Sequence, residues 1–217
     1  MSRAAFPEIT WPLDEAAIEL ARDWSQGASE QFIGWLWQSF HILLEEAPVL
    51  GKPKPDFEAF ERSLTHHHFI CLSRLVGKET GGFAAFTVHH EMPELESRKA
   101  APAMPPAYDM AFVWNENPRV AWPVEAKVLP STGTLAPYLG DTRKLTDSGA
   151  PFSGAAAQIA YLCAGDAATF FEKLSGKIDL APNPASTGTD RPQHTSRHPR
   201  LKKPTLQIHH LLMRLGR

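Results

Sequence analysis

The sequence predicts an α/β fold in which helices flank a central mixed β-sheet. Residues 29–47 repeat apolar side chains at helical steps of three and four, whereas residues 108–114 and 120–129 are short apolar runs that suit buried strands. The composition agrees, because 43% hydrophobic and 21% charged residues in 217 positions are ordinary for a globular domain. We therefore expect one main domain of residues 53–217, preceded by a helical extension of residues 1–52.

The N-terminal extension is predicted to hold two helices, over residues 13–24 and 29–47. The second helix carries a one-sided set of large apolar residues and ends at Pro48. The residues on that face are Ile33, Trp37, Phe40 and Leu44. We expect this tryptophan-rich layer to pack on the main domain, or else to dock a second copy of the chain or another protein.

In the main domain the pattern predicts the order helix, strand, strand, strand, helix, strand. The expected elements are a helix at 57–76, strands at 83–90, 108–114 and 120–129, helices at 154–164 and 166–175, and a strand at 205–212. Residues 130–152 are expected to form a long loop with a short helical piece near Thr142. The proline-rich residues 181–204 are expected to be a mobile insertion.

The chemistry is predicted on the two strands before that loop. Strand alternation places Glu125 and Lys127 on one face. A three-residue turn at 116–118 puts Asp109 opposite Glu125, because residues equally distant from the turn pair with each other. Two carboxylates that close repel unless a cation lies between them, so the arrangement favours Mg²⁺ or Mn²⁺. The alternative is a surface hairpin with solvated charges, and the apolar residues of both strands argue against it.

Physical roles follow for each of these residues. Asp109 and Glu125, with the Ala126 carbonyl as a further candidate ligand, would hold a metal that activates water and polarises a phosphate. Lys127 would orient or deprotonate that water and offset charge in the transition state. The expected reaction is therefore metal-assisted hydrolysis of a phosphate ester.

A strand with Asp109, a turn, a strand with Glu125-x-Lys127 and then a helix resembles the PD-(D/E)xK nuclease superfamily, over residues 57–212. The resemblance implies a restriction-endonuclease-like core and Mg²⁺- or Mn²⁺-dependent hydrolysis of phosphodiester bonds. The expected substrate is DNA, with a role in processing or defence against foreign DNA, such as that of phage. Two alternatives stay open: an inactive nuclease-fold binding module or partner subunit, and a metal hydrolase acting on nucleotides or small phosphate esters.

The resemblance also implies further site residues. Gln158 and Tyr161 resemble a Gln and a Tyr on the helix that follows the Glu-x-Lys strand, although their spacing is one residue shorter than in the family. Gln158 is accordingly expected to be catalytic, and Tyr161, with Arg143 and Lys144, to contact substrate. Many members add a glutamate from the first core helix. Three glutamates are equal candidates for that position: Glu58, Glu61 and Glu79.

The remaining features set limits on function. No apolar run approaches the roughly 20 residues that cross a bilayer, so we expect no membrane association. The two cysteines, Cys71 and Cys163, are expected to be free thiols in a cytoplasmic protein. The net charge of -2 gives no overall attraction to polyanions, but the basic stretch 191–203 is a candidate phosphate contact. The histidine runs are expected to be solvated or packed, with His89 a candidate for proton transfer.

Overall fold

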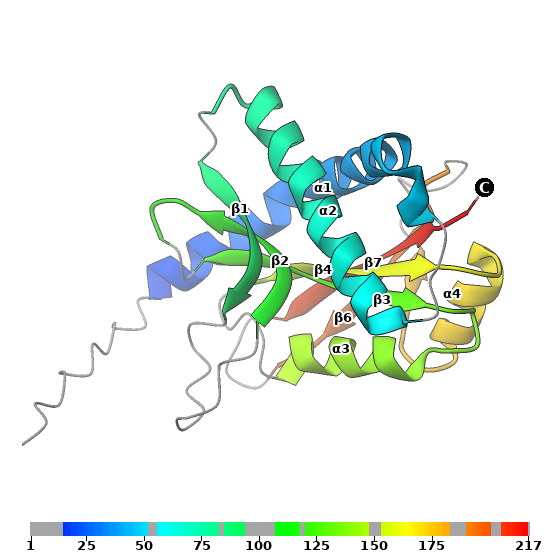
Figure 1. The fold of residues 1–217 in the computed structure, drawn as a ribbon. Helices are drawn as coiled ribbons and strands as arrows, with labels where there is room; N and C mark the ends of the chain where they lie inside the picture. The colour runs from blue at the N-terminus through cyan, green and yellow to red at the C-terminus, as the bar shows by residue number, and fades with distance from the viewer. Residues whose placement is uncertain are drawn as a thin grey trace, which may run out of the picture.

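The computed structural model describes residues 15–51, 56–82, 85–93, 107–117, 120–147, 153–182, 190–200 and 205–216. Within these ranges four α-helices and seven strands form an α/β fold (Figure 1). The helices are α1 (Glu15–Glu46), α2 (Phe57–Glu79), α3 (Ala136–Asp147) and α4 (Ala167–Ser175), with the 3-10 turn η1 at Pro48–Gly51. The strands are β1 (Phe86–Pro93), β2 (Ala107–Trp114), β3 (Ala121–Leu129), β4 (Ala155–Leu162), β5 (Ala181–Pro182), β6 (Gln193–His198) and β7 (Leu206–Arg214).

The seven described strands form one mixed sheet in the order β1-β2-β3-β4-β7-β6-β5. Strands β1, β2 and β3 are antiparallel neighbours, β3, β4 and β7 are parallel, and β6 and β5 return to antiparallel pairing. The middle strands are covered on both faces, and every residue of β4 is buried. A charged side chain on these strands must therefore be paired or hydrogen-bonded, because burial of a lone charge is costly.

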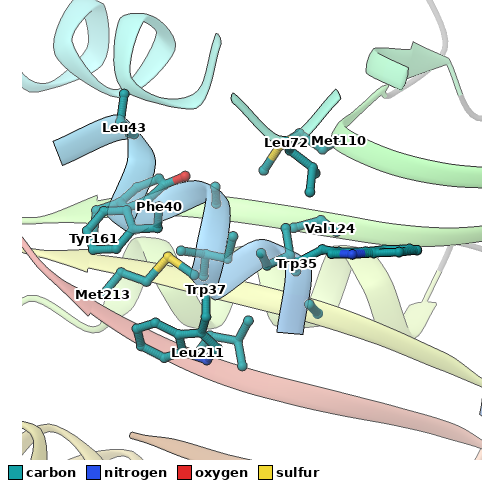
Figure 2. Packing of buried hydrophobic residues seen from close by; sticks show 14 of the residues in the cluster. Trp35, Trp37, Phe40, Leu43, Leu72, Met110, Val124, Tyr161, Leu211 and Met213 are labelled. Atoms are coloured by element: carbon teal, nitrogen blue, oxygen red, sulfur yellow. The ribbon is translucent and has the colours of Figure 1, made fainter. Parts of the chain in front are cut away.

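The two faces of the sheet carry different helices. Helices α1 and α2 share a hydrophobic cluster with one face, whereas α3 and α4 share a second cluster with the other. Figure 1 shows α1 and α2 together on one side and α3 across the sheet from them. On the first face Phe32 stacks on Phe112 with ring centroids 4.0 Å apart. Figure 2 shows Phe40 of α1 beside Tyr161 and Trp37 near Leu211.

The expected packing of the N-terminal layer on the main domain is confirmed. Trp35 and Trp37 are 3% and 2% exposed and lie in the core, so these two side chains are not available to dock a partner. The side chain of Trp24 lies outside the described part of the chain. None of the helices among the described residues is both long and apolar enough to cross a membrane.

The prediction of two N-terminal helices is wrong, because α1 runs without a break from Glu15 to Glu46. Gly27 lies inside the helix and is exposed. A glycine within a helix costs only about 1 kcal/mol. Packing of the apolar face on the sheet outweighs that cost, so the glycine does not end the helix.

The helix predicted at residues 154–164 is also wrong, since these residues form β4. A strand buried on both faces has no polar alternation, which is the pattern that identifies strands in a sequence. The helix at this place in the chain order is α3, within residues that were expected to be mostly loop. The predicted order therefore holds through α2 and β1 to β3 and is wrong after them, because α3 lies where a loop was expected and β4 where a helix was expected.

Part of the predicted mobile insertion is ordered sheet. Residues 181–182 form β5 and residues 193–198 form β6, which pairs along β7. Residues 183–189 and 201–204 lie outside the described residues. The sequence of β6, Gln-His-Thr-Ser-Arg-His, contains no apolar residue, so its pairing depends on backbone hydrogen bonds that leave no hydropathy signal. The predictions of α2, β7 and α4 are confirmed apart from their end residues.

Candidate functional site

The hairpin of β2 and β3 has the register that the sequence predicts. Met110 lies opposite Val124, and the same register continued by one residue brings Asp109 beside Glu125. On the other side of Asp109, Glu91 interrupts the ladder between β1 and β2 with a φ of 48°, in the left-handed region. The ladder pairing of β2 with β3 ends at Met110, and beyond it the Asp109 side chain contacts β3: its Oδ2 accepts a hydrogen bond from Ala126 N at 2.7 Å. Burial raises the pKa of Asp109, and this hydrogen bond opposes the rise.

Glu125 is the most buried carboxylate of the site, with 2% of the residue exposed. Its Oε1 lies 2.7 Å from Nζ of Lys144 on α3. Burial, and next the charge of Asp109, raise the pKa of Glu125 to about 8. A buried carboxylate beside a second carboxylate is a costly arrangement that a cation stabilises.

Lys127 lies between helices from the two faces of the sheet. Its Nζ is 2.7 Å from Glu61 Oε1 on α2 and 3.5 Å from Asp141 Oδ2 on α3. Burial by itself lowers the pKa of Lys127, but the hydrogen bond with Glu61 and the charge of Asp141 outweigh burial and raise the pKa. Lys127 is therefore a positively charged donor held in a fixed position.

The structure distinguishes the three candidate glutamates. Glu61 contacts the site twice, through Lys127 and through a 2.7 Å hydrogen bond that its Oε2 accepts from Val128 N. Glu58 is exposed and pairs with Arg62, and Glu79 accepts a hydrogen bond from the Trp35 indole. Sequence spacing could not separate them, because the choice depends on which turn of α2 crosses β3.

Helix α3 supplies two site residues, Asp141 and Lys144, of which the sequence interpretation missed Asp141. They are three positions apart, so they project from neighbouring turns of one helix face. Burial raises the pKa of Asp141, while the charges of Lys127 and Lys144 lower it. Recognition of residues 136–147 as a helix would have been the signal for this pair. Arg143 is exposed on α3 and does not line the cavity described below.

Gln158 lies beside the site and is not among the residues that line the cavity described below. It is the register partner of Glu125 across β3 and β4, and it is fully buried. Its Nε2 donates to the Tyr138 carbonyl at 2.6 Å, and its Oε1 accepts from Thr142 Oγ1 at 2.7 Å. Gln158 therefore ties β4 to α3, and this geometry does not fit a direct catalytic role.

The structure does not bring Tyr161 to the site as a substrate contact. Tyr161 is fully buried and its hydroxyl lies 2.6 Å from His68 Nδ1, among the side chains of α1 and α2. Alternate residues of a strand point to opposite faces. Gln158 and Tyr161 are three residues apart on β4, so they cannot share a face as they would on the expected helix.

A cavity of about 580 Å³ lies beside these residues, and Asp109, Lys127 and Glu61 are on its wall. His90 also lines it, whereas the predicted candidate His89 is exposed and hydrogen-bonds Thr87. The other lining residues are Phe57, Glu58, Arg62, Thr65, Glu91, Val128, Pro130, Thr134 and Pro137. The cavity gives a ligand direct access to Asp109 and Lys127.

The charges of the site fit a divalent cation. Four carboxylates and two ammonium groups lie together, which leaves an excess of two negative charges when all six are ionised; they are Glu61, Asp109, Glu125, Asp141, Lys127 and Lys144. Within the described part of the chain, no three or more His, Cys, Asp or Glu side chains converge as a ready metal site. Mg²⁺ commonly binds one or two carboxylates and completes its shell with water and substrate phosphate. Asp109 and Glu125 fit that mode.

The chain matches no protein-family model, no curated protein and no solved structure.

The buried histidines are packing residues. His68, His209 and His210 lie in the core, and His210 is hydrogen-bonded to Tyr138 and Ser196. Burial lowers the pKa of His68 and His209 to about 4 and that of His210 to about 3. These three side chains are neutral near pH 7, in agreement with the expectation of packed histidines.

Proposed function

We propose that this chain is a metal-dependent nuclease of the PD-(D/E)xK type, with a restriction-endonuclease-like core, that hydrolyses phosphodiester bonds in DNA. The observation that carries the proposal is the meeting of Asp109, Glu125 and Lys127 on two adjacent strands. Asp109 and Lys127 line a cavity, and Glu125 is buried behind them with a raised pKa. Buried charges of both signs beside a cavity are typical of a catalytic centre.

The residues have distinct roles in this proposal. Asp109 and Glu125 would hold Mg²⁺ or Mn²⁺, which when bound polarises the scissile phosphate and acidifies a water molecule. Lys127 directs its ammonium group at the reacting phosphate or water and offsets negative charge as it develops. Glu61 and Asp141 hold Lys127 from two sides, so its position is fixed before substrate arrives.

The chain order supports the restriction-endonuclease-like part of the proposal. The strand with Asp109, the turn and the strand with Glu125 and Lys127 are β2 and β3, and the helix that follows them is α3. A role in the processing of foreign DNA, or in defence against it, belongs to the same proposal. We also propose that the protein is cytoplasmic, which the free thiols of Cys71 and Cys163 support.

The test is a cleavage assay on the full chain with supercoiled plasmid, linear duplex, single-stranded DNA and RNA. Each substrate is incubated with Mg²⁺, with Mn²⁺ or with EDTA. We expect metal-dependent cleavage of DNA by the wild type and its loss in Lys127→Met. Lys173→Met is the matched control, because Lys173 is exposed on α4.

Other results would favour the alternatives. Absence of cleavage with every substrate and both metals would overturn the nuclease and favour an inactive binding module or partner subunit. Hydrolysis of nucleotides or small phosphate esters without cleavage of nucleic acid would favour a different metal hydrolase. Cleavage of the closed plasmid would identify endonuclease action.

A further inference from the structure

Lys144 places its ammonium group among the carboxylates proposed as metal ligands. Its Nζ lies 2.7 Å from Glu125 Oε1 and donates to the Ala107 carbonyl oxygen at 2.8 Å. The Glu125 side chain is 3% exposed and the Lys144 side chain 31% exposed. Lys144 thus reaches from α3 to a buried carboxylate while part of its side chain remains in contact with solvent.

Asp109 also lies within the influence of this ammonium group. The charge of Lys144 lowers the pKa of Asp109 more than the charge of Lys127 does. Of the two site lysines, Lys144 is thus the one that contacts Glu125 and also acts more strongly on Asp109. Lys127, by contrast, is engaged by Glu61 and Asp141.

A divalent ion bound by Glu125 and Asp109 would lie close to this ammonium group. Both are cations, and their repulsion is strong in a site so poorly exposed to water. One of the two must leave the carboxylates. The four-carbon stem of Lys144 is flexible and already partly exposed, so the ammonium group has a short path to solvent.

We propose that Lys144 is a built-in substitute for the metal: its ammonium group pairs with Glu125, next to Asp109, in the metal-free protein and moves away when a divalent cation binds. The released ammonium group is then free to contact a phosphate oxygen of the substrate. This inference rests on the proposed function. It assigns to Lys144 a contact with substrate only in the metal-bound state.

The first test measures Mn²⁺ binding to the full chain by calorimetry, without nucleic acid. Because the wild type must displace Lys144, we expect Lys144→Met to bind Mn²⁺ about tenfold or more tightly, equivalent to about 1.4 kcal/mol. Lys127→Met removes the same charge from a lysine that pairs with Glu61 and Asp141 and not with Glu125, so the Mn²⁺ affinity should rise less. Equal affinity in Lys144→Met and wild type, or an equal rise in both variants, would overturn the inference.

The second test needs no variant. Surface amines of the wild type are labelled with acetic anhydride, with and without Mg²⁺, and the rate at each lysine is read by mass spectrometry. We expect Mg²⁺ to accelerate labelling of Lys144 at least threefold and to leave Lys173 unchanged. A rate at Lys144 that is unchanged or lower with Mg²⁺ would contradict displacement.

The two proposals fail in different ways. A wild type that binds no Mn²⁺ would contradict both the metal-dependent nuclease proposal and this inference. The wild type could instead bind Mn²⁺ and cleave DNA while Lys144 is still labelled slowly in Mg²⁺. That result would contradict this inference alone.

Discussion

Glu61 on α2 and Lys127 on β3 form an ion pair of 2.7 Å, while the second carboxylate oxygen of Glu61 accepts a hydrogen bond from Val128 N. The side chains are 21% and 25% exposed, so the pair is largely shielded from water. One glutamate thus fixes both the ammonium group and the backbone of the strand that carries it. The pair explains how Lys127 keeps one position in the wall of the cavity.

Glu61→Gln leaves the shape of this pair intact but removes the charge that orients Lys127. For the proposed nuclease activity, we therefore expect turnover to fall roughly 10- to 100-fold with little change in KM. Glu58→Gln is the matched control, because Glu58 is on the same helix and exposed. Steady-state kinetics on duplex DNA provide the measurement. An equal loss in both variants would show that the effect is not specific to Lys127.

Gln158→Ala tests the link between β4 and α3. The change removes both side-chain hydrogen bonds to α3 and leaves the buried Tyr138 carbonyl without this donor. We expect a loss of roughly 2–4 kcal/mol in unfolding free energy. Urea denaturation measures it, with the exposed Gln31→Ala on α1 as control. A Gln158→Ala protein as stable as the wild type would contradict the role of Gln158 in linking β4 to α3.

Glu125→Gln is predicted to stabilise the metal-free protein at alkaline pH. Burial and Asp109 raise the pKa of Glu125 to about 8 from 4.5, so its contribution to stability is present at low pH and lost as pH rises toward and through 8. The neutral amide avoids that loss, which is on the order of 3–5 kcal/mol. Thermal unfolding in EDTA at pH 5 and pH 9 should show the variant's advantage only at pH 9. The same advantage at both values would contradict the charge argument.

His68 predicts a second pH dependence. Its pKa is lowered from 6.5 to about 4 by burial, so the folded state resists protonation and stability is lost as pH falls from 6.5 toward 4. His68→Gln loses the native hydrogen bonds of His68, but it also removes the destabilisation that His68 causes at low pH. The gap in unfolding free energy between variant and wild type should therefore narrow by about 2 kcal/mol between pH 7 and pH 5. A gap that stays constant with pH would show that His68 is not neutral in the core.

Alanine substitutions at two glycines, Gly165 and Gly27, should change the stability of the fold in opposite directions. Gly165 has a φ of 110°, and a Cβ there would lie 2.5 Å from Thr132 Cγ2, so Gly165→Ala should destabilise the fold by at least about 1–3 kcal/mol. Gly27 lies within α1 with open space around it, so Gly27→Ala should stabilise by about 0.5–1 kcal/mol. Thermal melts of both variants check the opposite signs. Destabilisation by Gly27→Ala would argue against a continuous α1.

The sequence predicted the elements whose apolar residues repeat with a clear strand or helix period. The alternation of Val124, Ala126 and Val128 identified β3, and the turn before it fixed the register that brings Asp109 toward Glu125. The pattern failed where burial or polarity removed the periodicity. Strand β4 is buried on both faces and resembles a helix in composition, while β6 is polar throughout and resembles a loop.

The site shows the same division. Asp109, Glu125 and Lys127 were predictable, because they lie on one hairpin whose geometry is set by neighbours in sequence. Glu61 remained one of three choices, and Asp141 was missed, since each enters the site from a helix on a different face of the sheet. The family resemblance placed Gln158 and Tyr161 on a helix. Both are residues of β4 instead: Gln158 links the strand to α3, and Tyr161 packs in the core.

The sequence by itself determined the α/β class, the hairpin and the three polar residues on it, because strand alternation and turn length act over a few residues. Only the tertiary structure decided which carboxylates surround Lys127 and which ammonium group pairs with Glu125. Those choices depend on how α2 and α3 pack across the sheet. That packing is set by contacts between residues far apart in the chain, such as the 66 positions that separate Glu61 from Lys127.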